Sequence, residues 1–232
     1  MNAVTTIGFD ADDTLWENEQ VFRLTQERFA DLLADHVDAD HLMERLLEAE
    51  RRNVGHYGFG IKGFVLSMIE TAVEVTGGRV PGTVVGRLLD EGREMLRHPV
   101  DLLPGAEEAV RVLSASHRIV LITKGDLLDQ ERKLAASGLG DLFDAVEIVS
   151  DKTAATYARA FAAHGDGAER ALMVGNSMKS DVVAAIEAGA WGVHCPSAIE
   201  WALEAAPAPE EASRFRRIAA LSDLPELVAG LS

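Results

Sequence analysis

Several features of secreted, membrane-bound and zinc-binding proteins are missing from this sequence. Cys195 is the single cysteine, so no internal disulfide can form, and no Cys/His pair has the spacing of zinc ligands. No window reaches the roughly 18 consecutive apolar residues of a membrane-spanning helix. The first residues lack the basic start and the apolar stretch of a signal peptide. We therefore expect a cytoplasmic protein.

Basic residues are also scarce. The 22 Lys and Arg residues face 38 Asp and Glu residues, which gives a formal net charge of -16 over 232 residues, and no basic run provides a local exception. A uniformly acidic surface repels phosphate backbones and anionic lipids. Nucleic acids and membranes are therefore not expected as partners. A chain of this length can bury a full hydrophobic core without disulfides.

Five short apolar runs, bounded by polar or turn residues, have the character of buried strands. They are Thr5–Phe9, Arg118–Thr123, Ala145–Ser150, Ala171–Gly175 and Trp191–Cys195. Helical patterns that close at glycine separate the last four runs. These are Leu127–Ser137, Ala154–His164 and Asp181–Ala188. The alternation predicts an α/β fold with a Rossmann-like parallel sheet and helices on both faces.

The long stretch between the first two strands has only helical patterns. The expected helices are Asn18–Leu33, Ala39–Asn53, Gly63–Val75 and Val84–Arg97. We therefore predict two domains. An α/β core would consist of residues 1–15 and 99–232, and an all-helical domain would be inserted at residues 16–98.

The first strand is followed by three carboxylates within four positions, Asp10, Asp12 and Asp13. Like charges in a cleft of low dielectric constant raise one another's pKa, so a divalent cation is the obvious compensation. Period-two alternation places Asp10 and Asp12 on the same side of an extended segment, facing the crevice beyond the strand ends. The alternative is an Asp-rich turn whose side chains cap the following helix.

Four motifs, in this order, resemble the signatures of the haloacid dehalogenase-like (HAD) superfamily of hydrolases. Asp10–Thr14 matches the first motif, D-x-D-x-T, and Thr123 matches the Thr or Ser that ends the next core strand. Lys152 matches the Lys that opens a later helix, and Gly175–Asp181 matches the acidic fourth motif. The resemblance covers essentially the whole chain. It implies a HAD-like core whose helical insertion is a cap that closes over the active site.

The resemblance also implies a role for each matching residue. Asp10 would attack phosphorus to form an aspartyl-phosphate, Asp12 would act as general acid and then as general base, and Lys152 would pair with Asp10. Mg²⁺ would offset the repulsion between the Asp10 carboxylate and a phosphate dianion. The implied metal ligands are Asp10, Asp12 through its backbone carbonyl, Asn176 and Asp181.

Substrate contacts are expected from both predicted domains. Thr123 and the following backbone amides, at Lys124 and Gly125, would hold the phosphoryl oxygens. In the helical domain, the glycine-rich segment His56–Phe64 is expected to join two helices, and it carries Lys62. Lys62 would either reach an anionic group of the substrate or belong to a simple turn packed by aromatic side chains.

Two positions depart from the family pattern. Asn176 stands where the fourth motif usually has its first Asp. Its carbonyl can still bind a hard cation but adds no negative charge, so we expect weaker metal binding, and loss of activity stays open. Asp13 stands where the family often has Gly, and it would either support the metal indirectly or cap the turn.

The leading interpretation is a Mg²⁺-dependent phosphomonoester hydrolase that acts on a small phosphorylated metabolite. A metal-independent 2-haloacid dehalogenase shares the fold and the nucleophile, but those enzymes typically lack the second Asp, so Asp12 favours the phosphatase. A phosphosugar mutase would use the same residues. A catalytically silent metabolite-binding protein would fit the loss of charge at Asn176. The substrate and the oligomeric state stay open.

Overall fold

The computed structural model describes residues 3–199 and 201–231. The chain forms two compact units. The first comprises Met1–Glu19, Val100–Lys124 and Gln130–Ser232, and the second comprises Gln20–Pro99 and Gly125–Asp129. The sequence did not predict that residues 125–129 would group with the second unit. The predicted domain boundaries, between residues 15 and 16 and between residues 98 and 99, stay a prediction.

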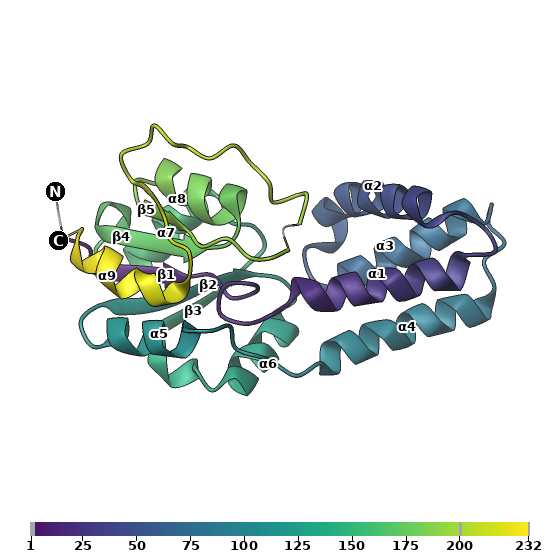
Figure 1. The fold of residues 1–232 in the computed structure, drawn as a ribbon, viewed down its shortest axis with the longest axis horizontal. Helices are drawn as coiled ribbons and strands as arrows, with labels where there is room; N and C mark the ends of the chain where they lie inside the picture. Colours follow the sequence, from purple (N-terminus) through teal and green to yellow (C-terminus); the bar gives the residue numbers. More distant parts are fainter. Residues whose placement is uncertain (1–2, 200, 232) are drawn as a thin grey trace. The chain divides into compact units, whose positions relative to one another are not determined.

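The first unit contains a parallel sheet in the order β3-β2-β1-β4-β5-β6 (Figure 1). The strands are β1 Thr6–Phe9, β2 Arg118–Lys124, β3 Ala145–Val149, β4 Ala171–Gly175, β5 Trp191–His194 and β6 Phe215–Arg217. The predicted parallel α/β fold is therefore confirmed, with each of the five expected strands found to within one residue at either end. The edge strand β6 was missed, because its three residues include two arginines and form no apolar run.

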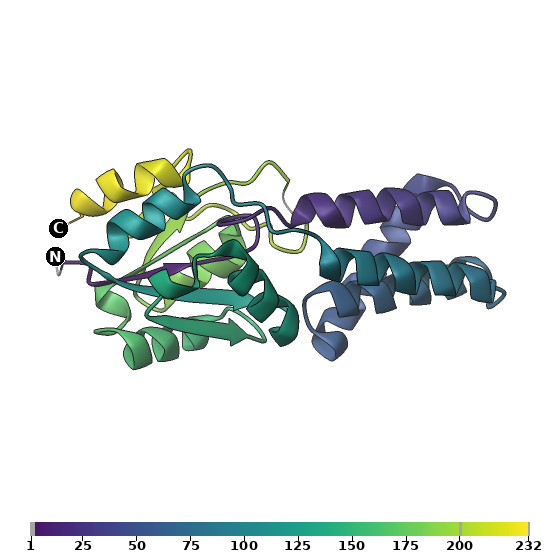
Figure 2. The same ribbon diagram turned by 90° about the horizontal axis from the view of Figure 1, so that it is seen from below.

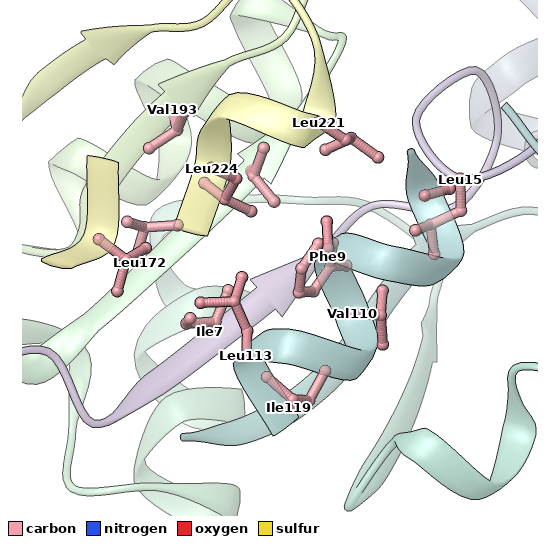
Figure 3. Close-up of a cluster of buried hydrophobic side chains, with 14 of the residues drawn as sticks. Ile7, Phe9, Leu15, Val110, Leu113, Ile119, Leu172, Val193, Leu221 and Leu224 are labelled. Atoms are coloured by element: carbon pink, nitrogen blue, oxygen red, sulfur yellow. The ribbon is translucent and has the colours of Figure 1, made fainter. Parts of the chain in front are cut away.

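Helices cover both faces of this sheet. They are α5 Ala106–Ser114, α6 Leu127–Ser137, α7 Ala154–His164, α8 Ala184–Glu187 and α9 Leu224–Ala229. Strand side chains alternate between the faces, so α5 and α9 pack with Ile7 and Phe9, whereas α7 and α8 pack with Val120 and Met173. Figure 3 shows the first of these two clusters, in which Val110 and Leu224 approach the strand residues.

The helix predicted at Asp181–Ala188 begins earlier than expected. A π-helical turn, Met178–Val183, precedes α8. The Ser177 hydroxyl oxygen accepts a hydrogen bond from the Ser180 backbone N–H at 2.9 Å, which starts this turn at the residue after Ser177. The predicted start at Asp181 was therefore wrong, because the serine cap was overlooked.

The second unit contains four helices, which lie side by side in both views (Figures 1 and 2). They are α1 Glu19–Leu33, α2 Ala39–Tyr57, α3 Ile61–Val75 and α4 Gly82–Arg97. Their shared apolar core includes Phe29, Leu46, Met68 and Leu88. Within the described part of the chain, no helix combines the length and the apolar character needed to cross a bilayer.

The connection between α2 and α3 is shorter than the predicted segment His56–Phe64. It consists of residues 58–60, because α2 continues to Tyr57 and α3 begins at Ile61. Gly58 and Gly60 have φ angles of 76° and 112°. Residues with a Cβ atom rarely adopt positive φ angles, whereas glycine adopts them readily. Glycine at these two positions therefore permits the abrupt reversal, and the predicted nine-residue loop was wrong.

Candidate active site

The candidate site of the first unit lies at the carboxyl ends of the central strands. Asp10 follows β1, Thr123 lies near the end of β2, and Asn176 follows β4. Strand β1 pairs with β2 on one side and with β4 on the other. In open α/β sheets this change in strand order opens a crevice beyond the carboxyl ends, where ligands bind.

Two carboxylates share one buried ammonium group at this edge. Lys152 Nζ donates to Asp10 Oδ1 and, at 2.7 Å, to Asp181 Oδ1. Burial raises the pKa of Asp10 to about 7, with the Asp181 carboxylate adding to the rise and Lys152 opposing it. Burial alone would lower the pKa of Lys152, but the two carboxylates raise it above its usual range. When Asp10 is ionised, the cluster carries one more negative than positive group.

Thr14 brings Asn176 next to Asp10. The Thr14 hydroxyl lies 3.1 Å from Asp10 Oδ2 and 3.3 Å from Asn176 Oδ1, and it accepts a hydrogen bond from the Asn176 backbone N–H at 3.1 Å. One hydroxyl proton cannot satisfy both oxygens at once. The Asp10 carboxylate and the Asn176 amide oxygen therefore lie close together on either side of the Thr14 hydroxyl, and both are potential metal ligands.

The Asp181 carboxylate is held from several directions. Its Oδ2 accepts a hydrogen bond from the Ser177 backbone N–H at 2.9 Å, and the Tyr157 hydroxyl lies 3.4 Å from its Oδ1. A Cβ on Gly175 would collide with this carboxylate, so the close approach requires glycine there. Burial raises the pKa of Tyr157 well above its usual value, so this side chain stays a neutral donor.

The oxygen atoms of this cluster suit a hard divalent cation. Within the described residues, no group of three or more His, Cys, Asp or Glu side chains gathers as a metal site. However, Mg²⁺ commonly binds only one or two carboxylates and completes its coordination with water and substrate phosphate. The carboxylates of Asp10 and Asp181 and the amide oxygen of Asn176 therefore fit Mg²⁺, and the excess negative charge at Lys152 favours a cation.

Asp12 has a separate set of partners. Its Oδ1 accepts hydrogen bonds from Trp16 Nε1 at 2.7 Å and from Lys133 Nζ at 2.9 Å, and its Oδ2 accepts one from Gln130 Nε2 at 2.9 Å. The sequence interpretation missed Gln130 and Lys133. Their spacing of three positions on one helix was the available signal, but nothing in it indicated which carboxylate they would meet.

Asp13 caps the helix that follows it. It has a φ angle of 58°, a left-handed conformation that glycine adopts readily and Asp only occasionally. Its carboxylate accepts hydrogen bonds from the backbone N–H groups of Asn18 and Glu19 at 3.0 to 3.1 Å. Burial raises the pKa of Asp13 to about 6, and these hydrogen bonds oppose the rise. The geometry therefore favours the capping interpretation.

The predicted phosphoryl-binding segment begins in the first unit. Thr123 is buried, and its hydroxyl accepts a hydrogen bond from Gln130 Nε2 at 3.1 Å. Lys124 Nζ donates to Ser180 Oγ at 2.8 Å and to Glu204 Oε1 at 2.5 Å. The Lys124 side chain is therefore bound to Ser180 and Glu204, and binding of phosphoryl oxygens by the Lys124 backbone amide stays a prediction.

Glu204 is a further residue that the sequence interpretation missed. Its Oε2 accepts a hydrogen bond from Ser177 Oγ at 2.5 Å, so it joins the end of β2 to the turn that carries Asp181. Burial alone would raise the pKa of Glu204, but Lys124 and the Ser177 hydroxyl hold it below its usual value. It lies in an irregular Pro/Ala/Glu-rich segment, where no motif marked it.

Gly125 and Lys62 belong to the second unit. Gly125 has a φ angle of 137°, which favours glycine. Lys62 Nζ lies 3.2 Å from Asp126 Oδ1, and the Lys62 backbone N–H donates to Asp126 Oδ2 at 3.2 Å. A role of either residue in substrate binding stays a prediction.

The chain is similar to known proteins over most of its length. Residues 4–189 match the haloacid dehalogenase-like hydrolase family. A haloacid dehalogenase-like family hydrolase from Xanthomonas campestris is 41% identical with a TM-score of 0.88, and the match covers 99% of this chain and 92% of that one. No curated protein matches.

Two more distant solved structures share the fold. A Bacillus subtilis protein, described as a HAD-hydrolase and bound to magnesium, is 17% identical with a TM-score of 0.68, with 98% of this chain and 99% of that chain covered. A 2-haloacid dehalogenase from Pseudomonas syringae is 20% identical with a TM-score of 0.61, with 99% of this chain and 100% of that chain covered. At these identities the likeness concerns the fold alone.

Proposed function

This chain belongs to the haloacid dehalogenase-like hydrolase family, and we propose that it is a Mg²⁺-dependent phosphatase of small phosphorylated metabolites. The carrying observation is Asp12, a second carboxylate two positions after Asp10 whose partners are separate from the Lys152 cluster. A departing alkoxide needs a proton, which such a carboxyl group can supply, whereas a departing halide needs none.

Asp10 is the proposed nucleophile. Lys152 and Thr14 bind its two oxygens and fix the direction of its attack on phosphorus. The ammonium group of Lys152 also offsets part of the repulsion between this carboxylate and a phosphate dianion. After the attack the phosphoryl group is carried on Asp10 as an aspartyl-phosphate, which water then hydrolyses.

Metal binding is proposed at Asp10, Asp181, Asn176 and the backbone carbonyl of Asp12. Bound Mg²⁺ would supply Lewis-acid stabilisation of the phosphoryl oxygens and further neutralise the Asp10 carboxylate. Because Asn176 contributes an amide oxygen without charge, we expect weaker affinity than a third carboxylate would give. The relative from Bacillus subtilis that binds magnesium supports this proposal as an analogy of fold.

Binding of the phosphoryl group is proposed at the end of β2 and in the residues that follow it. The Thr123 hydroxyl and the backbone amides of Lys124 and Gly125 would donate to phosphoryl oxygens, which adds no charge. The helical unit would act as the cap that excludes water, with Lys62 directed to an anionic part of the substrate. A cytoplasmic location also stays part of the proposal.

The second candidate is a 2-haloacid dehalogenase. It is favoured by the uncharged side chain at Asn176, because this reaction needs no metal ion. This reaction would use Asp10 as the nucleophile in the same way. It would not need Asp12 as an acid, because halide leaves without a proton.

Both candidates are tested by measuring hydrolysis of p-nitrophenyl phosphate and dechlorination of 2-chloropropionate, each with Mg²⁺ and with a chelator. We expect phosphate release that needs Mg²⁺, and we expect Asp10→Asn to lower it by at least about 1,000-fold. The exposed Asp141→Asn provides a control with the same change of charge. Metal-independent dechlorination without phosphate release would replace the proposal with the dehalogenase, and unchanged turnover in Asp10→Asn would refute the nucleophile.

A further inference from the structure

Two side chains of α6 bind the Asp12 carboxylate through different oxygens. Gln130 and Lys133 are 3% and 7% exposed, and each nitrogen lies 2.9 Å from its Asp12 oxygen. Their spacing of three positions puts them on one face of the helix. Trp16 adds its indole N–H to the oxygen that Lys133 binds. The carboxylate therefore cannot rotate without breaking hydrogen bonds on both sides.

Gln130 also connects Asp12 with the predicted phosphoryl-binding segment. Its Nε2 lies 3.1 Å from the Thr123 hydroxyl and 2.7 Å from the Lys124 carbonyl oxygen. The Gln130 Oε1 atom is buried, and no described residue provides a hydrogen-bond partner for it. An unsatisfied buried acceptor is unfavourable for folding, so packing alone does not account for glutamine here.

Lys133 is equally poorly explained by packing. A buried ammonium group needs polar partners to offset its desolvation, and Lys133 Nζ contacts Asn18 Oδ1 at 2.7 Å in addition to Asp12. It thus fixes Asp12 relative to the segment that leads into α1. Two buried polar side chains, Gln130 and Lys133, thus orient the single carboxylate of Asp12.

We propose that Gln130 and Lys133 are positioning residues that hold Asp12 in the orientation for proton transfer to the leaving oxygen. The inference rests on the proposed phosphatase function. In that reaction an Asp10 oxygen bonds to phosphorus while the ester P–O bond breaks, and the Asp12 proton passes to the departing oxygen to form the alcohol. Asp12 then accepts a proton from the water that attacks the aspartyl-phosphate.

Among the described hydrogen bonds, Asp12 Oδ1 accepts two and Oδ2 accepts one. A carboxylate oxygen has two lone pairs, so the two bonds fill Oδ1 and leave one lone pair on Oδ2. The geometry therefore assigns proton transfer to Oδ2, the oxygen that Gln130 orients.

The test compares phosphate esters that differ in leaving group but hardly in shape. p-Nitrophenyl phosphate releases a weakly basic phenolate that needs little protonation, whereas phenyl phosphate releases a more basic one. We expect Lys133→Met and Gln130→Met to lower kcat for phenyl phosphate by about 10- to 100-fold and for p-nitrophenyl phosphate by less than about 3-fold. A purely structural role would lower both rates alike.

Glu131→Gln is the matched control, because Glu131 is exposed on the same helix and the substitution also changes one charge. It should leave both rates unchanged. Trp16→Phe removes a single N–H donor with little loss of volume. We expect it to lower kcat for phenyl phosphate more than kcat for p-nitrophenyl phosphate, but by less than the α6 variants do. It provides a second measurement if the α6 variants do not fold, which thermal unfolding would reveal.

Equal losses on both esters, or none on either, would overturn the inference while leaving the phosphatase proposal intact. A wild-type protein that hydrolyses neither ester with Mg²⁺ would instead refute the phosphatase proposal itself, and the inference with it. The two failures are therefore distinguishable from the same set of rates.

Discussion

Exposed ion pairs occur in both units, for example between Arg111 and Glu107 in the first, but the two units differ in whether they also bury ion pairs. In the first unit, Lys152 joins Asp10 and Asp181 with side chains that are 2%, 9% and 1% exposed. In the second unit, the ion pair between Arg93 and Asp90 has side chains that are 60% and 70% exposed. Among the ion pairs of the described residues, those with both side chains largely buried lie in the first unit.

The buried ion pairs of the Lys152 cluster and the exposed pair between Arg93 and Asp90 differ in what they cost the fold. Removing ions from water costs several kcal/mol per group, and the attraction within a pair only partly offsets it. Exposed pairs lose little hydration and stabilise a fold by roughly 0 to 1 kcal/mol. Burying the Lys152 cluster is therefore costly for folding, and its position at the strand ends agrees with the proposed catalytic use.

The largest expected effect is on the buried side of this comparison. Lys152→Met removes the ammonium group and leaves Asp10 and Asp181 without their common partner. We expect the free energy of unfolding to fall by about 3 to 5 kcal/mol, because an unpaired charge would stay buried. Denaturant unfolding measures this change. A loss below about 1 kcal/mol would mean that the pair is as weakly coupled as an exposed one.

An intermediate effect is expected for the ion pair between Lys124 and Glu204, whose side chains are 12% and 13% exposed. The folded-state pKa of Glu204 is lowered, so its carboxylate stabilises the fold above the usual pKa of 4.5, and this contribution is lost as the pH falls through the folded-state value. Glu204→Gln should lower the free energy of unfolding by about 2 kcal/mol at neutral pH, and the difference should shrink in acid.

Denaturant unfolding of wild type and Glu204→Gln at a series of pH values, from neutral to acidic, measures the difference in the free energy of unfolding. It also shows whether this difference shrinks or grows as the pH falls. A difference that grew in acid would contradict the lowered pKa. Equal free energies of unfolding for wild type and Glu204→Gln at all pH values would mean that the pair between Lys124 and Glu204 stabilises the fold no more than an exposed pair does.

The smallest effect is expected on the exposed side. Arg93→Gln breaks the pair with Asp90 on the surface of α4. Because both side chains are well hydrated, we expect the free energy of unfolding to change by less than about 0.5 kcal/mol, with hydrolysis unaffected. The same denaturant unfolding measures it. A loss of 2 kcal/mol or more would remove the contrast between the two units.

Much of the fold could be predicted because local sequence patterns follow from local physics. Strands buried on both faces need continuous apolar runs, and β4 was predicted at Ala171–Gly175 to the residue. Glycine ends helices, and α6 and α7 were predicted as accurately. Where the local signal was weak, as in β6, or misread, as at the Ser177 cap, the prediction failed.

Sequence order and strand ends likewise determined which residues stand at the candidate site. Asp10, Thr123 and Asn176 follow or end neighbouring parallel strands, and connectivity alone brings such ends to one edge of the sheet. The sequence could not decide between the two interpretations of Asp13. Its hydrogen bonds to the start of α1 depend on the path of the chain after the turn.

Only the tertiary structure decided which cation faces the Asp12 carboxylate. Lys152 meets Asp10 across 142 positions of sequence, and Lys133 meets Asp12 across 121. A spacing along the chain fixes a helix face or a strand end, because these depend on neighbouring residues. The resemblance already implied that Lys152 pairs with Asp10. The pairing of Lys133 with Asp12 depends on how distant elements pack, so it could be assigned only in three dimensions.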